Sequence, residues 1–148
     1  MESDHRPYFA LFTEIGIIAQ LSRALLESRL SFGLNQAQFS VLNHLVRLGD
    51  GRTPLSIAKA FQTAKTSMTH TLAVLEAEGL VQLRPNPKDG RSRCVWLTAK
   101  GRACREEAIA SLDPDFARMA THFSPEDLAK IMPVLTALRQ YMDAARDR

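Results

Sequence analysis

The sequence has few of the residues that build disulfide frameworks, zinc sites or membrane spans. Its 148 residues include only two cysteines, Cys94 and Cys104. Two cysteines are too few for a disulfide framework or a cysteine zinc site, and a reducing compartment is the expected setting. No apolar run approaches the roughly 20 residues of a membrane-spanning helix. The polar stretch Met1–Pro7 lacks a signal-peptide pattern. We therefore expect a cytoplasmic protein with no membrane contact.

Motifs for catalysis and cofactor binding are missing as well. The sequence contains no phosphate-cradling glycine motif, no nucleophile elbow and no paired-histidine metal motif. The four histidines are scattered, and no two have helical ligand spacing with a carboxylate partner; they are His5, His44, His70 and His122. We therefore expect no enzymatic activity, no metal and no cofactor.

The net positive charge is small, but basic residues are concentrated in one stretch. The net charge is only +3, with an isoelectric point near 9.1. Between Arg84 and Arg102, however, six basic residues stand against the single acid Asp89. This stretch holds more than the positive excess of the whole chain. Such clustering is typical of a nucleic-acid contact, although a charge run can also be a merely solvated face.

Two long helices are predicted at the ends of the chain. Residues 8–30 repeat apolar side chains at three- and four-residue steps, on more than one face. A second apolar stripe follows the helix start at Ser124–Asp127. Asp113–Pro114 should break the helix that begins near Thr98. In a chain this small, an apolar surface on two sides of a helix predicts contact with a second subunit.

The centre of the chain predicts a helix-turn-helix followed by a hairpin. Helices are expected from about residue 35 to 48, from Thr53–Pro54 to about 61, and from about 64 to 78. Two short strands, 80–84 and 93–97, flank the turn-forming residues 85–90, with Asp-Gly near the tip. A helix-turn-helix with a basic hairpin directly after it is the pattern of a winged helix.

The same residues resemble the MarR family of transcriptional regulators. The match includes Leu75–Val81, Asn86–Arg91 and Leu97–Gly101, and residues 34–42 resemble the second helix of the family. Asp89-Gly90-Arg91 corresponds to the Asp-x-Arg element of the family's wing. The resemblance implies a fold that is mainly α with a small β-hairpin wing, a homodimer formed through the terminal helices, and DNA binding.

This sequence departs from the family at several positions. The family often has a basic residue at the position of His70 and an acidic–basic pair at Ala73 and Val74, so the base-reading surface is less charged here. Relatives that sense organic hydroperoxides use a cysteine in the first helix, and this chain has none before Cys94. Burial as small hydrophobic residues is the favoured interpretation of Cys94 and Cys104, with redox sensing as the alternative.

Candidate DNA-contacting residues fall on the third central helix and on the wing. The first turns of a recognition helix reach base edges in the major groove, and we assign this role to Lys65, Thr66, Ser67, Thr69 and His70. Arg91 suits the narrow minor groove. Arg84, Lys88 and Arg93 are expected to contact phosphates. Asp89, which phosphates would repel, is expected to brace the wing, while Thr63 is expected to be only a helix cap.

The sequence therefore predicts one MarR-like domain over residues 1–148. A winged helix-turn-helix lobe covers about 34–97, and dimerisation helices cover about 8–30 and 98–146. The expected function is ligand-responsive repression of transcription by a homodimer bound to a pseudo-palindromic double-stranded operator, with an unidentified small-molecule effector. A winged helix that binds protein instead of DNA, and a cysteine-based redox sensor, are the alternatives.

Overall fold

The computed structural model describes residues 4–147. Met1–Ser3 and Arg148 lie outside the described residues. The first of these belong to the stretch that lacks a signal-peptide pattern. The chain divides into two compact units, one ending at Ser111 and the other beginning at Leu112. The elements of the first unit are, in chain order, α1 (Arg6–Glu27), α2 (Gln36–Leu48), α3 (Pro54–Ala60), α4 (Lys65–Ala77), β1 (Val81–Asn86), β2 (Asp89–Leu97) and α5 (Ala99–Ser111). The second unit contains α6 (Asp113–Ala120) and α7 (Pro125–Ala145).

Side-chain caps start the helices at the predicted places. Asn35 and Gln38 form a reciprocal capping box: the Asn35 side chain accepts from the Gln38 amide at 2.9 Å, and the Gln38 side chain accepts from the Asn35 amide at 3.0 Å. Thr53 caps α3 through the Ser56 amide at 3.2 Å. Thr98 Oγ1 accepts from the Gly101 amide at 3.0 Å. These contacts satisfy amides that have no partner within their own helix.

The two ends of helix α4 are closed in different ways. Its N-cap is Ala64, which makes no side-chain cap hydrogen bond, so the expectation that Thr63 caps this helix is wrong. Its C-terminus is closed by Gly79, whose φ is +73°. The Gly79 amide donates to the carbonyl of Glu76, and the Leu80 amide donates to that of Leu75, both at 2.9 Å. This is a Schellman motif, and it turns the chain directly into β1.

The core of the first unit lies among α2, α3, α4 and the base of the wing. Helical spacing predicts Leu42 and Leu72 on the inner faces of their helices, and both are buried. Helical spacing on α3 predicts that Leu55, Ala58 and Phe61 face inward, but this is wrong at Leu55, which is 46% exposed, and Ile57 is buried instead. The buried cluster consists of Leu34, Val41, Leu42, Leu45, Ile57, Ala58, Met68, Leu72, Leu75, Leu80, Val81, Val95 and Cys104.

The wing is longer than the sequence predicted, and its turn lies elsewhere. Strands β1 and β2 pair antiparallel from Val81–Leu97 to Asn86–Asp89, with an irregularity after Pro85. The turn is formed by Pro87 and Lys88, whereas Asp89 and Gly90, expected near the tip, belong to β2. Strand pairing beyond the short apolar segments extends the hairpin, because the ladder needs only backbone groups.

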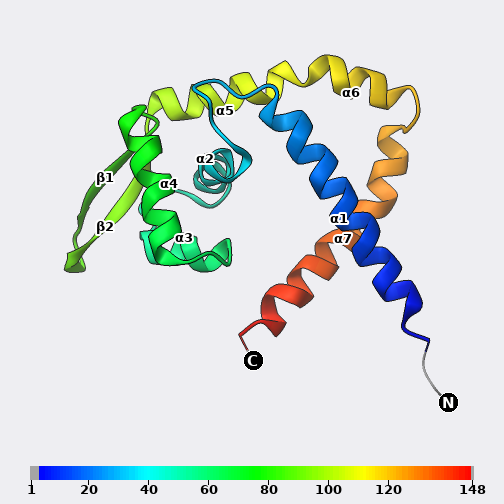
Figure 1. The fold of residues 1–148 in the computed structure, drawn as a ribbon, viewed down its shortest axis with the longest axis horizontal. Coiled ribbons are helices and arrows are strands. Elements are labelled where there is room, and N and C mark those ends of the chain that lie inside the picture. The colour runs from blue at the N-terminus through cyan, green and yellow to red at the C-terminus, as the bar shows by residue number, and fades with distance from the viewer. Residues whose placement is uncertain (1–3, 148) are drawn as a thin grey trace. The chain divides into compact units, whose positions relative to one another are not determined.

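The wing lies beside α4 (Figure 1), and long-range hydrogen bonds fix it against the helices. The α2–α3 loop pairs with β2, since the Gly51 amide donates to the Val95 carbonyl at 2.9 Å and the Val95 amide donates to the Arg52 carbonyl at 2.8 Å. The Glu76 carboxylate on α4 accepts from the Leu83 amide on β1 at 3.0 Å. The wing and α4 are thereby held in one orientation.

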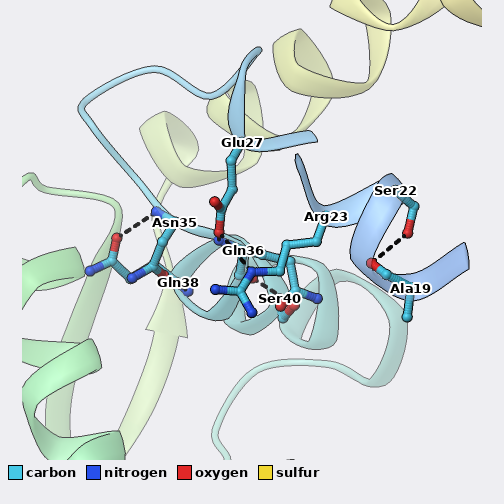
Figure 2. A network of polar contacts seen from close by, with 8 residues as sticks. All are labelled: Ala19, Ser22, Arg23, Glu27, Asn35, Gln36, Gln38 and Ser40. Atoms are coloured by element: carbon cyan, nitrogen blue, oxygen red, sulfur yellow. Dashed lines mark hydrogen bonds and ion pairs between the residues drawn. The ribbon is translucent and has the colours of Figure 1, made fainter. Parts of the chain in front are cut away.

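The C-terminal end of α1 is joined to α2 by polar contacts (Figure 2). The Glu27 carboxylate accepts from the Gln36 amide, the first of α2, at 2.9 Å. Arg23 pairs with the same Glu27 oxygen at 3.4 Å. A carboxylate at a helix N-terminus is stabilised by the helix dipole and by the free amides there. This junction ties α1 to the helix-turn-helix.

Most of α1 is exposed in the single chain. Large apolar side chains along it are 40–74% exposed, namely Tyr8, Phe9, Leu11, Phe12, Ile17, Ile18 and Leu21. Contrary to the expectation that no stretch is long and apolar enough to cross a membrane, Arg6–Glu27 meets that criterion of length and composition. Helices that pack against other protein surfaces satisfy the same criterion, so this property alone does not distinguish the two environments.

The second unit has its own capped helices. The predicted break at Asp113–Pro114 is confirmed, because α5 ends at Ser111 and α6 begins at Asp113. Ser124 caps α7 in a capping box with Asp127, as the sequence predicted. Pro133 lies inside α7, which runs through it to Ala145. The exposed apolar residues of this unit include Phe116, Phe123, Leu128, Ile131, Met132, Val134, Leu135, Tyr141 and Met142.

Candidate nucleic-acid interface

The exposed face of α4 carries every residue that the sequence assigned to base recognition. Met68, Leu72 and Leu75 bury the opposite face in the core. This burial turns the small and polar side chains outward, and the exposed set comprises Lys65, Thr66, Ser67, Thr69 and His70. The first turn therefore offers one cation and several short donors and acceptors to a partner.

The Thr69 hydroxyl already uses its proton within the helix. Thr69 Oγ1 donates to the carbonyl of Lys65 at 2.9 Å. A hydroxyl has one donor hydrogen and two acceptor lone pairs. In this conformation Thr69 presents an acceptor and a methyl group, which suit a base amino group or a thymine methyl rather than a base acceptor.

Short polar contacts organise the wing around its turn. The Asp89 carboxylate accepts from the backbone amide of Arg91 at 2.9 Å. The Asn86 side chain makes two contacts. Its Oδ1 accepts from the Lys88 backbone amide at 3.0 Å, and its Nδ2 donates to Ser92 Oγ at 2.9 Å. The Asp89 contact is thus to the main chain of Arg91, and the carboxylate shapes the strand that presents the arginine.

A groove of about 680 Å³ lies between α4, the start of α3 and the wing. Lys65 and Thr69 line it from α4, and Arg91 and Arg93 line it from β2, with Asp89 at the start of β2. The fold brings these five residues to one surface, although they are up to 28 positions apart in the sequence (65 to 93). Three cations face a single acid whose oxygen is engaged by a backbone amide.

Two other predicted phosphate contacts lie in a different place. Arg84 and Lys88 line a second cleft, of about 560 Å³, together with Trp96 and the α2–α3 loop residues Gly51 and Thr53. Ser67 also lies outside the α4–wing groove and lines a smaller pocket of about 300 Å³ between α2 and α4. Eight of the ten candidate residues therefore divide among three surfaces of the lobe, whereas Thr66 and His70 are exposed on α4 and line none of the three.

Several residues of this surface were missed at the sequence level. Thr53, Pro54 and Leu55, at the start of α3, line the α4–wing groove. Ser92 and Asn86 line it too and stabilise the turn. The Thr-Pro helix start and the Asn in the turn were visible signals, but they were interpreted only as local structure, since nothing in the sequence shows that α3 and the hairpin face the same groove.

Two buried groups of the lobe have shifted pKa values. His44 packs against Phe61 with ring centroids 5.2 Å apart, and burial, helped by Arg52 and Arg47, lowers its pKa. Burial, with Glu107 nearby, raises the pKa of the Cys104 thiol. Cys94 and Cys104 are both buried and free, as the favoured interpretation expected. A buried thiol with a raised pKa is a poor nucleophile at neutral pH.

Metal-ligating side chains do not gather in the part of the chain that the structure describes. Among residues 4–147, no group of three or more histidine, cysteine, aspartate or glutamate residues could hold a metal ion.

Comparison with known proteins identifies the architecture. Residues 32–92, which contain the helix-turn-helix and most of the wing, match the model of the MarR family. The chain is similar to a serine mutant of MarR from E. coli complexed with operator DNA, at 26% identity over 92% of this chain and 99% of that one, with a TM-score of 0.72. Residues 32–92 are therefore similar to the MarR family, and the chain shares the fold of these structures.

Two further structures share this MarR-family fold. The transcriptional regulator BldR from Sulfolobus solfataricus has 23% identity and a TM-score of 0.76, over 96% of this chain and 99% of that one. The MarR-family regulator SP03579 has 26% identity and a TM-score of 0.72, over 97% and 95%. The predicted fold class, mainly helical with a hairpin wing, is confirmed, and the chain has the fold of a MarR-family transcription regulator.

Proposed function

We propose that this chain is a transcriptional repressor that binds a pseudo-palindromic operator as a homodimer. Helix α4 enters the major groove, where Lys65, Thr66, Ser67, Thr69 and His70 reach base edges and sugar-phosphates. The wing lies along the adjacent minor groove, and Arg91 enters it. Because DNA is the partner, the protein works in the cytoplasm of a bacterial-type cell.

The observation that carries this proposal is the α4–wing groove. It collects Lys65, Thr69, Arg91 and Arg93 from two elements onto one surface. A recognition helix beside a basic hairpin can occupy neighbouring major and minor grooves of a duplex. A protein-binding wing would have no general need for three cations at this place. The E. coli relative whose structure contains operator DNA supports the same assignment.

Dimerisation is supported by the exposed apolar surfaces of α1 and α7. Monomeric proteins rarely expose contiguous apolar surface of this extent, and a two-fold dimer that presents two copies of α4 explains a pseudo-palindromic site. A small-molecule effector, implied by the family resemblance, would regulate the dimer by favouring a spacing of the two lobes that does not match the operator.

Selection of bound sequences from a pool of random duplexes tests this function. The proposal expects an enriched inverted repeat whose half-sites lie about one helical turn apart. It also expects affinity for random duplex to fall steeply as salt rises, because bound cations release counterions from the DNA. Recovery of no enriched sequence, together with no salt-dependent binding of random duplex, would favour the protein-interaction alternative.

A further inference from the structure

One face of the wing lies opposite Leu83 and Val95 and is not explained by the α4–wing groove. In the antiparallel register Arg84 pairs with Cys94, and Gln82 pairs with Trp96. Since side chains alternate between the faces of a hairpin, these residues share one face, which we call the outer wing face. The opposite face carries Val95, which is completely buried, and Leu83, which packs on the core.

The second cleft described above opens on the outer wing face. Its volume is about 560 Å³, and its cationic lining residues are Arg84 and Lys88, whereas none of the residues 4–147 that line it carries a carboxylate. Its remaining lining is largely flat and apolar, and comprises Gly51, Thr53, Pro85, Asn86, Pro87, Cys94 and Trp96. Two cations without a lining acid make a site that is complementary to an anion.

Arg84 is held in place within this cleft before any anion arrives. Its guanidinium carbon lies 4.5 Å from the centroid of the Trp96 ring, and its Nε donates to the Gln82 side-chain carbonyl at 3.1 Å. The Trp96 ring lies beside the α2–α3 loop, since a Cβ added at Gly51 would be 3.6 Å from it. A stacked guanidinium loses less conformational freedom on binding, and its terminal nitrogens are the donors that remain for an oxyanion.

We propose that the outer wing face binds one backbone phosphate of duplex DNA through Arg84 and Lys88, with Trp96 as the positioning residue for Arg84. This inference rests on the proposed function. A hairpin that lies in a minor groove about 6 Å wide has a row of phosphates on each side. Arg91 and Arg93 face the α4 side, and the Arg84–Lys88 pair serves the other row. The wing is therefore bound from both faces.

Trp96 is the single tryptophan of the chain, so its fluorescence reports directly on this cleft. Titration with duplex DNA should change Trp96 emission to a saturating value, in parallel with the binding measured by anisotropy of a labelled duplex. Inorganic phosphate at the same phosphate concentration should leave the emission unchanged. Unaltered emission at full DNA occupancy, or an equal change with inorganic phosphate, would overturn the proposal.

A double-mutant cycle separates positioning from mere packing. Arg84→Ala should lower the slope of log affinity against log salt by about 0.9 for each subunit bound. Trp96→Leu, which keeps the charge count, should weaken DNA binding by a similar factor, and adding it to Arg84→Ala should weaken binding little further. Trp96→Phe, which keeps a ring under the guanidinium, should restore most of the affinity.

Each variant is compared at a salt concentration and temperature where urea denaturation shows it to be folded. The control for loss of one positive charge is Arg139→Ala, on α7. Additive losses in the cycle, or an Arg84→Ala slope equal to that of Arg139→Ala, would assign Trp96 to the fold and refute the phosphate site. If the unmodified protein binds no DNA at all, the proposed function fails as well; if it binds normally while the outer-face variants behave as the control, only this inference fails.

Discussion

At the scale of single residues, the wing contains a carboxylate where phosphate electrostatics alone would disfavour one. Asp89 lines the same groove as Arg91 and Arg93, yet its oxygen accepts a hydrogen bond from the Arg91 amide at 2.9 Å. A local side-chain-to-backbone bond of this kind defines the conformation of a turn. The carboxylate contributes shape, and the arginines contribute charge.

Substitution of Asp89 distinguishes shape from charge. Asp89→Ala should weaken operator binding, although it makes the wing more positive, because the segment that presents Arg91 loses its brace. Arg91→Ala should make the salt dependence shallower by about 0.9 in slope for each subunit. Fluorescence anisotropy with labelled operator at several salt concentrations measures both effects. Tighter binding by Asp89→Ala, or an Arg91→Ala loss no larger than that of Arg139→Ala, would contradict the assignment.

His44 makes the stability of the lobe depend on pH. Its pKa in the folded chain lies below the usual value near 6.5, chiefly because burial disfavours the charged ring. The folded state therefore binds this proton less readily than the unfolded state. Stability is complete above the unfolded pKa and declines as the pH falls below it towards the folded pKa.

Urea denaturation at pH 7.5 and pH 5 tests this linkage. The wild-type midpoint should fall more between these two conditions than the midpoint of His44→Gln, which has no titrating ring at this position. His122→Gln, at an exposed site in the second unit, is the matched control and should retain the wild-type dependence on pH. An identical pH response in His44→Gln and the wild type would show that His44 does not titrate differentially.

At the scale of secondary-structure elements, the geometry of the lobe depends on where α5 meets β1. The Thr98 hydroxyl donates to the Gly79 carbonyl at 2.6 Å, and Lys100 Nζ donates to the Glu78 carbonyl at 2.6 Å. Gly101 follows in the first turn of α5, and a Cβ there would collide with the Leu80 carbonyl and lie 2.8 Å from Leu97 Cδ1. The helix can approach the strand this closely only because residue 101 has no side chain.

Gly101→Ala should therefore destabilise the protein, by about 1–3 kcal/mol as expected for an overpacked site. Helix propensity alone predicts the opposite sign, a gain of about 1 kcal/mol. Gly16→Ala is the control, since a Cβ at this position in α1 would meet nothing within 4 Å, and it should be neutral or stabilising. Chemical denaturation gives both values, and a stabilised Gly101→Ala would show that α5 can shift at no cost.

At the scale of the whole molecule, the extent of exposed apolar surface argues for assembly. The intact chain should sediment as a dimer at micromolar concentration in buffer without detergent. Deleting residues 1–21, which removes most of α1, should cause aggregation or unfolding, because the proposed dimer contact through α1 is lost. Analytical ultracentrifugation and circular dichroism provide the measurements. A soluble, folded monomer of the intact chain, or a requirement for detergent, would contradict dimerisation through α1.

Much of the local structure is determined by short sequence patterns. Asn35, Thr53 and Ser124 start helices where they were expected to, because a cap needs only a side chain and an amide three residues later. The buried stripe Met68–Leu72–Leu75 follows directly from helical periodicity. The family motif around the wing likewise identifies the architecture without coordinates.

Side-chain burial on α3, the position of the turn and the surfaces that residues share depend on the tertiary structure. Leu55 is exposed and Ile57 buried because the short α3 orients by its contacts rather than by its own periodicity. The turn lies at Pro87–Lys88 because strand pairing extends past the apolar segments. The division of the cations between the α4–wing groove and the outer wing face depends on hairpin register. Sequence chemistry thus specified which residues are charged, capped or apolar, whereas packing and backbone pairing over long range determined which of them share a surface.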